Sequence, residues 1–118
     1  MFGLFKSKSA LNPIDAVEMV EKSLLQLIDI RDISEIKASG IAKGALHIPL
    51  MMMNVKADPR HPEFEKCLDP AKPTAVYCAS GARSFMAVRQ LKKLGFEDVH
   101  NLGGLAHWVQ AGGKIVSV

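Results

Sequence analysis

The feature that most constrains the fold is a pair of short apolar runs, each followed by residues with helical spacing. Residues 24–30 are nearly all apolar and end in charge, and residues 74–77 form a second such run. Runs of this length and character are typical of strands buried on both faces of a parallel sheet. The second run is followed by a helical pattern over residues 84–94, and parallel strands are usually connected through a helix. The chain therefore predicts a parallel sheet built from strand–helix units.

The rest of the chain alternates between helix-like and strand-like segments. Asn12 followed by Pro13 predicts a helix start, because asparagine caps helices and proline suits the first helical position. Helices are also expected at residues 33–37, in pieces of residues 51–68 and around Trp108, and strands at residues 44–49 and 98–101. We predict an N-terminal tail, residues 1–10, that is flexible, and one domain, residues 11–118. Its class is α/β: a central, mainly parallel sheet with helices on both faces.

Composition excludes several classes of function. The 118 residues, 48% hydrophobic and 23% charged, suit one soluble domain with one core. The net charge of +3 comes from dispersed lysines with few aromatic residues between them, so we expect no nucleic-acid partner. The longest apolar patch, residues 45–53, is too short to cross a bilayer, which predicts no transmembrane segment. Two cysteines are too few for a disulfide framework, and a cytoplasmic location is expected.

Cys78 is the candidate catalytic residue. In open parallel sheets, ligands bind beyond the carboxyl ends of the strands, often where a loop leads into a helix. Cys78 lies at such an end, and the residues that follow it are Ala79, Ser80, Gly81, Ala82, Arg83 and Ser84. We call residues 78–84 the Cys78 loop. Its small residues allow the backbone to curl around the sulfur with N–H groups pointing inward, and Gly81 permits a positive φ there.

These surroundings are expected to lower the pKa of the Cys78 thiol. The dipole of the following helix and the Arg83 guanidinium both stabilise a thiolate, and such settings bring thiol pKa values down to about 3.5–7.5. The alternative is a small buried hydrophobe, since most cysteines at strand ends are inert. The glycine in the loop and the arginine at the helix start favour the reactive thiol. Cys67 lies on the apolar side of an amphipathic turn and is expected to be structural.

The remaining candidate site residues are interpreted mainly as structural. Asp29 and Arg31, at the end of the first apolar run, form either a purely structural ion pair or a support for the Cys78 loop. Trp108 is expected to pack in the core. The four histidines have no metal-ligand spacing with one another or with the cysteines, so we predict no metal and no other cofactor. The methionines at positions 51–53 are expected to fill a core or a pliable surface.

Four segments, in order along the chain, resemble the motifs of rhodanese homology domains. Residues 78–84, Cys-Ala-Ser-Gly-Ala-Arg-Ser, resemble the family's active-site pattern Cys-x-x-Gly-x-Arg followed by Ser or Thr. Residues 27–31 look like its early strand, which ends in Asp-x-Arg, and residues 40–49 resemble its Gly-His-Ile-Pro-Gly-Ala…Ile-Pro segment. Residues 103–108 are similar to its closing Gly-Gly-x-x-x-Trp. The likeness covers nearly the whole chain.

The resemblance implies sulfur transfer in two half-reactions. The Cys78 thiolate attacks the outer sulfur of a donor such as thiosulfate, and a thiophilic acceptor then removes that sulfur from the cysteine persulfide. The loop amides are expected to hold the outer sulfur, Arg83 to stabilise the anionic loop and position an anionic donor, and Ser84 to cap the helix and fix the loop. The expected partners are a small sulfur-containing anion or a low-molecular-weight persulfide, and a sulfur donor or acceptor protein.

The chain also departs from the family pattern. Ile41 stands where the family often has histidine and Lys43 where it often has proline, which puts a supporting hydrogen bond in doubt. Ala79, Ser80 and Ala82 are uncharged, whereas related enzymes with high thiosulfate activity tend to place extra basic residues in or beside this loop. We therefore expect thiosulfate to be a poor substrate and a protein or low-molecular-weight persulfide to be a better one.

Two other functions stay open. The first is a persulfide carrier or partner-binding module in a sulfur relay, which sequence does not separate from a transferase. The second is a cysteine-dependent phosphatase or arsenate reductase. Loops of that kind place five residues between cysteine and arginine to fit a tetrahedral oxyanion, whereas four lie between Cys78 and Arg83. The shorter loop favours a cradle that fits a single sulfur.

Overall fold

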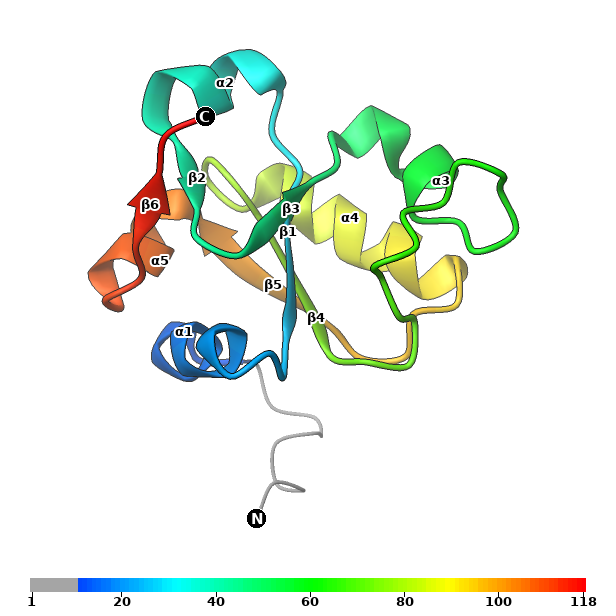
Figure 1. The fold of residues 1–118 in the computed structure, drawn as a ribbon, viewed down its shortest axis with the longest axis horizontal. Coiled ribbons are helices and arrows are strands. Elements are labelled where there is room, and N and C mark those ends of the chain that lie inside the picture. Colours follow the sequence, from blue (N-terminus) through cyan, green and yellow to red (C-terminus); the bar gives the residue numbers. More distant parts are fainter. Residues whose placement is uncertain (1–10) are drawn as a thin grey trace.

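A sheet of four parallel strands forms the centre of the molecule (Figure 1). The computed structural model describes residues 11–118, so the expected tail, residues 1–10, lies outside the described residues. The strands are β1 (Gln26–Asp29), β3 (Ala45–His47), β4 (Thr74–Cys78) and β5 (Val99–Gly104). Their order in the sheet is β3-β1-β4-β5, which makes β1 and β4 the two central strands. The predicted mainly parallel sheet is confirmed.

Helices cover both faces of this sheet. They are α1 (Pro13–Glu21), α2 (Ile33–Ser39), the 3-10 helix η2 (Leu50–Met52), α3 (Met53–Lys56), α4 (Ala82–Lys93) and α5 (Leu105–Gln110). One core packs α3 and α4 against the side of β4 that includes Val76. The other packs α1 and α5 against the side that includes Ala75, because successive side chains of a strand point to opposite faces. Trp108 of α5 lies in this second core and is 2% exposed, as predicted.

The ends of the helices follow from particular residues. α1 begins at Pro13 because the Asn12 side chain accepts a hydrogen bond from the Ile14 amide at 2.8 Å, as the sequence indicates. α4 begins at Ala82, two residues earlier than predicted, because Gly81 takes a φ of +106° and serves as its N-cap. The first three residues of α4 therefore belong to the Cys78 loop.

Three parts of the fold differ from the prediction. A second sheet of two antiparallel strands, β2 (Ile41–Ala42) and β6 (Ile115–Val116), has no counterpart in it, because two residues are too few to produce a periodic pattern. Helix is found only as far as Lys56 within residues 51–68, and the chain then passes through turns. Cys67 lies in those turns and is exposed, so its expected apolar setting is wrong.

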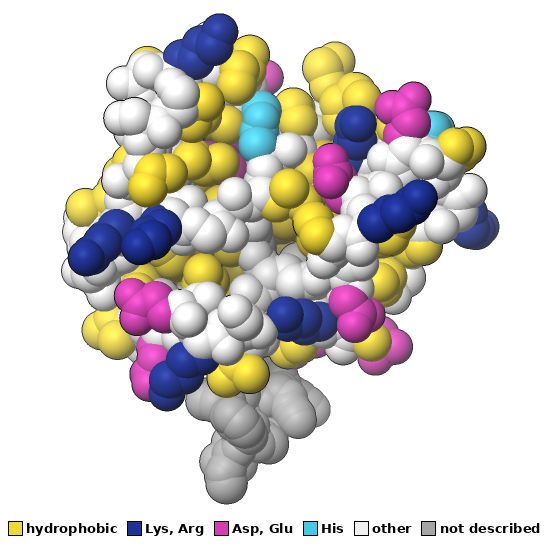
Figure 2. All heavy atoms as spheres, viewed as in Figure 1, with side chains coloured by type: hydrophobic (Ala, Val, Ile, Leu, Met, Phe, Trp, Pro, Cys, Tyr) yellow, Lys and Arg dark blue, Asp and Glu magenta, His cyan; other side chains and the backbone are white. Residues whose placement is uncertain are grey.

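The described surface carries both signs of charge. On the face drawn in Figure 2, Lys and Arg side chains are spread among acidic and neutral ones, and no continuous basic area covers it. Among residues 11–118, no helix has the length and apolar character that crossing a membrane requires.

Candidate active site

Cys78 is the last residue of β4, and its side chain is buried. The Gly81 amide donates a hydrogen bond to Sγ at 3.0 Å, and the Ser84 hydroxyl oxygen lies 3.5 Å from Sγ. The loop thus folds back over the sulfur, as its small residues allow. The loop residues that are exposed to solvent are Ala79, Ser80 and Ala82.

The hydrogen bonds around Sγ favour the thiolate. Burial raises the pKa of the Cys78 thiol, but hydrogen bonding with the Ser84 side chain and hydrogen bonds from the backbone amides of Ser84, Gly81 and Ser80 together lower it by more. The net pKa lies below the ordinary value of a thiol. These donors all belong to the Cys78 loop, so the loop both shields the sulfur and stabilises its charged form.

Arg83 fastens the loop to α2. Its two terminal nitrogens donate to the two carboxylate oxygens of Glu35, at 2.7 and 2.9 Å. The pair lowers the pKa of Glu35 to about 2 and raises that of Arg83, in both cases chiefly through this hydrogen bonding. The charge of Arg83 is therefore shared with a carboxylate, which the sequence did not lead us to expect.

Glu35 also supports its own helix. Its Oε1 accepts a hydrogen bond from the Asp32 amide at 3.1 Å, which forms a capping box at the start of α2. The spacing Asp-x-x-Glu is a signal for such a box, so the capping role was open to prediction. The ion pair with Arg83, 48 positions away, was not.

Asn101 of β5 connects the Cys78 loop to the neighbouring strand. Its Oδ1 accepts hydrogen bonds from the Ser84 hydroxyl at 2.6 Å and from the Gly103 amide at 2.8 Å. Its Nδ2 donates to the Gly81 carbonyl at 3.2 Å. Ser84 thus fixes the loop as expected, but it does not cap the helix, because Gly81 is the N-cap. No sequence signal distinguished Asn101 from other polar residues.

The two glycines of the closing motif pack against the loop. A Cβ on Gly104 would overlap the carbonyl oxygen of Ala79. The position of a Cβ on Gly81 lies 3.5 Å from the Cα of Gly103, so the two backbones run close together here. The motif Gly103-Gly104 therefore provides the space into which the Cys78 loop folds.

Asp29 and Arg31 form the predicted ion pair, with Nη2 and Oδ2 2.8 Å apart and side chains 0% and 4% exposed. Arg31 also donates to the Ser39 hydroxyl and the Gly40 carbonyl at the end of α2, both at 2.8 Å. Its guanidinium lies 5.7 Å from the ring centre of Tyr77, the residue before Cys78. The pair therefore supports the end of β4, and none of its hydrogen bonds within residues 11–118 reaches the Cys78 loop.

Residues 11–118 contain no group of three or more His, Cys, Asp or Glu side chains arranged to hold a metal ion. The candidate site is thus made of one thiol, the hydrogen-bond donors of its loop, and an arginine–glutamate pair. An arrangement of this kind stabilises an anionic sulfur nucleophile and a small anionic group attached to it.

Comparison with known proteins identifies a family and relatives of similar sequence. The family model for the rhodanese-like domain matches residues 12–111. A sulfurtransferase of Allochromatium vinosum is 37% identical over 92 residues, which cover 77% of this chain and 78% of the relative. The putative sulfur carrier protein YrkF of Bacillus subtilis is 34% identical over 71% of this chain and 41% of its own length.

Solved structures with a similar fold are also found. A Rhodopseudomonas palustris protein of unknown function, described as a possible tyrosine phosphatase, has a TM-score of 0.79 at 31% identity, covering 92% of this chain and 84% of its own. A rhodanese-related protein of Thermoplasma volcanium has a TM-score of 0.70 at 28% identity, covering 92% and 98%. By sequence and by fold, this chain belongs to the family of rhodanese-like domains, whose named members include sulfurtransferases.

Proposed function

We propose that the protein is a sulfurtransferase that carries a sulfane sulfur on Cys78. The observation that supports this best is the Cys78 thiol itself, with its lowered pKa and a loop of hydrogen-bond donors folded around it. In the first half-reaction the thiolate attacks the outer sulfur of a donor R–S–S⁻. The donor's S–S bond breaks, R–S⁻ leaves with the electron pair, and Cys78 becomes a persulfide anion.

In the second half-reaction an acceptor thiolate attacks the outer sulfur of that persulfide. The S–S bond on Cys78 breaks, the acceptor leaves as a persulfide, and the Cys78 thiolate is restored. The outer sulfur carries the negative charge between the two steps, and the amides of Ser80, Gly81 and Ser84, which lower the thiol pKa, are the nearest donors to stabilise it. Because Cys78 is buried, the proposed transfer requires the loop to move outward to admit each substrate.

The donor that fits this loop best is a protein or low-molecular-weight persulfide. Ala79, Ser80 and Ala82 bring no positive charge to the mouth of the site, and the charge of Arg83 is shared with Glu35. A dianion such as thiosulfate therefore meets little attraction there. We expect kcat/KM for a thiol persulfide to exceed that for thiosulfate by at least tenfold.

A persulfide carrier is the second candidate, and the likeness to the putative sulfur carrier YrkF favours it. A carrier and an enzyme share the first half-reaction, and they differ in whether the sulfur is released repeatedly. Multiple-turnover assays with a thiol acceptor in excess distinguish the two. A protein that takes up one sulfur and releases it slowly is a carrier.

Phosphatase activity is disfavoured, although one structural relative is described as a possible tyrosine phosphatase. The loop has four residues between Cys78 and Arg83 and is closed over Sγ by the Gly81 amide at 3.0 Å. Both terminal nitrogens of Arg83 are bonded to Glu35. Hydrolysis of a phosphate ester also needs a general acid for the leaving group.

The test of sulfur transfer is intact-mass spectrometry after incubation with cysteine persulfide. We expect the wild-type protein and Cys67→Ser to gain one sulfur, because Cys67 is exposed and lies outside the loop. Cys78→Ser should gain none. Equal loss of uptake in a folded Cys67→Ser variant would replace the one-cysteine mechanism with a disulfide relay. A wild-type protein that gains no sulfur from cysteine persulfide or thiosulfate would refute the proposal.

We also propose the cytoplasm as the location. Both cysteines are free thiols in the structure, and the proposed chemistry requires Cys78 to remain one. A reducing compartment maintains that state.

A further inference from the structure

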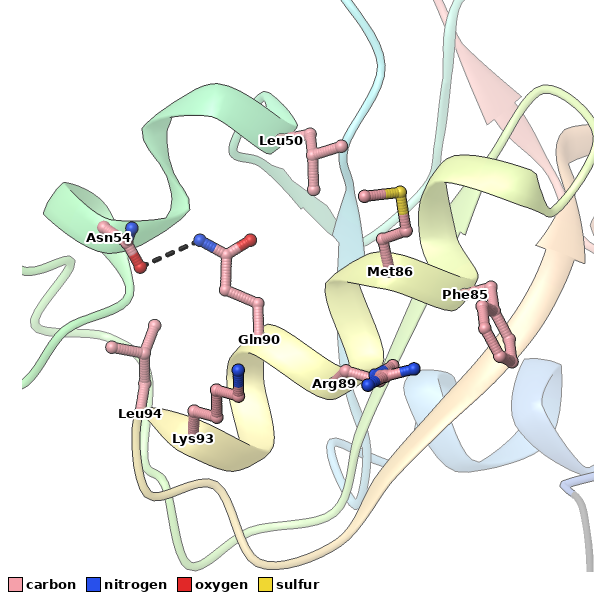
Figure 3. A pocket seen from close by; sticks show the side chains of 8 residues that line it. All are labelled: Leu50, Asn54, Phe85, Met86, Arg89, Gln90, Lys93 and Leu94. Atoms are coloured by element: carbon pink, nitrogen blue, oxygen red, sulfur yellow. Dashed lines mark hydrogen bonds between the residues drawn. The ribbon is translucent and has the colours of Figure 1, made fainter.

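A groove of about 480 Å³ lies between α4 and the segment formed by η2 and α3 (Figure 3). Its apolar lining comes from Leu50, Phe85, Met86 and Leu94. Phe85 and Met86 lie on α4 and directly follow the Cys78 loop in the sequence. One end of the groove is therefore next to the loop, and the other is near the end of α4.

Two of the apolar side chains of the groove, and one beside it, are largely open to solvent. Phe85 and Met86 are each 60% exposed, and Met51, which follows Leu50 in η2, is 85% exposed. Sites for small molecules enclose most of the ligand surface, whereas open apolar side chains beside a functional site are typical of protein interfaces. Phe, Met and Arg are also the residue types enriched at such interfaces.

The groove is positively charged. Arg89 and Lys93 line it one helical turn apart, and within residues 11–118 neither forms an ion pair. The polar residues that complete the lining are Asn54 and Gln90, which hydrogen-bond to each other at 2.8 Å (Figure 3). The lining thus contains two cations and no acidic side chain, which is complementary to an acidic partner.

We propose that this groove binds an extended, acidic segment of the protein that donates sulfur to Cys78 or accepts it. Apolar side chains of the segment pack on Phe85 and Met86, and its carboxylates pair with Arg89 and Lys93. The proposal rests on the proposed sulfur transfer, because it is the position of the groove beside the Cys78 loop that makes the partner a sulfur donor or acceptor.

The geometry of α4 sets the spacing of the partner's residues. At 1.5 Å per residue, Arg89 and Lys93 lie about 10 and 16 Å along the axis from the start of α4. An extended segment covers about 3.4 Å per residue. With its persulfide-bearing cysteine placed over the start of α4, its carboxylates lie about three and five residues from that cysteine. That cysteine leaves as a thiolate when the Cys78 thiolate takes its outer sulfur.

Synthetic peptides test the proposal directly. One peptide has a cysteine persulfide, an adjacent leucine, and glutamates three and five residues from the cysteine. A twin has lysine in place of each glutamate, and free cysteine persulfide is the small donor. Intact mass measures the rate of sulfur gain on Cys78, and fluorescence anisotropy measures binding of both peptides with serine in place of the cysteine.

We expect the acidic peptide to transfer sulfur to Cys78 about tenfold faster than its lysine twin and, in its serine form, to bind about tenfold more tightly. Lys93→Glu should reduce its advantage about threefold, and Arg89→Glu/Lys93→Glu should abolish it. Lys92→Glu is the matched control, because Lys92 is the exposed neighbour of Lys93 on α4 and lies outside the groove lining. It should leave the acidic peptide unaffected, and the small donor should react equally with all variants.

The outcomes separate the two proposals. Sulfur gain from free cysteine persulfide without discrimination between the peptides would overturn the docking site and leave sulfur transfer intact. No gain from any donor would overturn sulfur transfer, and the anisotropy comparison would still decide the docking site, since equal binding of the two peptides contradicts it. A single-stranded uridine oligomer that binds more tightly than the acidic peptide would also contradict the docking site. If Lys93→Glu weakens that binding, the groove is assigned to RNA.

Discussion

At the scale of single residues, the pairing of Arg83 with Glu35 places two opposite charges beside the Cys78 loop. Arg83 follows the small residues that cover the sulfur, and Glu35 neutralises it from α2. The two side chains are 35% and 33% exposed, so solvent screens the pair in part. The pair therefore influences the site mainly by holding the loop and by adjusting the local charge.

Replacing Glu35 and replacing Arg83 should shift the pKa of the thiol in opposite directions. Glu35→Gln leaves the charge of Arg83 uncompensated and should lower the pKa of Cys78, whereas Arg83→Ala should raise it. The measurement is the rate of alkylation by iodoacetamide as a function of pH. An identical midpoint in wild type and both variants would assign the activation of the thiol to the loop amides alone.

The same pair predicts how stability depends on acid. The pKa of Glu35 is lowered from its ordinary value of 4.5 to about 2 in the folded protein. A group with a lowered pKa stabilises the fold fully above the ordinary value, and this contribution is lost as the pH falls from 4.5 towards about 2. Glu35→Gln should lower the free energy of unfolding at pH 7 by about 1 kcal/mol, after allowance for solvent screening. Urea midpoints for both proteins should converge near pH 2; a constant difference from pH 7 to pH 2 would contradict the assignment.

At the scale of elements, the geometry of the candidate active site depends on the close approach of the Cys78 loop to the end of β5. Gly104→Ala should disrupt it, because the added Cβ overlaps the Ala79 carbonyl and pushes the loop outward. We expect the rate of sulfur gain on Cys78 to fall at least tenfold while the circular dichroism spectrum stays unchanged.

Gly95→Ala is the control for that substitution. Gly95 lies just after α4 with a φ of +106°, and a Cβ there meets nothing within 4 Å. It should cost about 1–2 kcal/mol of stability through backbone strain and leave the rate of sulfur gain unchanged. Sulfur gain at the wild-type rate in Gly104→Ala would mean that the loop tolerates displacement.

The elements near the site were largely predictable, and the contacts between them were not. The apolar run before Cys78 and the small residues after it predicted a strand, a tight loop and a helix start, since these features are local. Glu35 and Asn101 escaped prediction because each meets the loop across the fold, 48 and 20 positions from its partner. Local pattern determines an element, whereas its partner is set by how the elements pack.

At the scale of the whole molecule, the buried ion pair of Asp29 and Arg31 holds together β1, α2 and β4. The chain contains a second Asp-x-Arg sequence at Asp58 and Arg60, in which the arginine is 83% exposed. In both, the aspartate accepts a hydrogen bond from the amide of the arginine, at 2.9 and 3.0 Å. The two differ in burial and in side-chain hydrogen bonding: Arg31 bonds to Asp29, Ser39 and Gly40, whereas Arg60 bonds to Asp58 at 3.3 Å.

This contrast gives a matched pair of substitutions. Asp29→Asn leaves a buried guanidinium without its counter-charge and should lower the free energy of unfolding by about 3–5 kcal/mol, a large part of the total stability of a domain of this size. Asp58→Asn should leave the urea midpoint within error, because its partner is solvated. Equal small effects of the two substitutions would show that burial adds nothing to the first pair.

The burial of Cys78 under its loop also affects how readily its thiol is oxidised. Peroxide converts exposed thiolates to sulfenic acid and then to forms that thiols no longer reduce. The rate of this damage follows both thiolate character and access to solvent, and Cys78 combines a lowered pKa with a closed cover. We therefore expect peroxide to oxidise Cys78 more slowly than an exposed thiol of the same pKa. The loop whose hydrogen bonds favour the thiolate thus also shields it from oxidants.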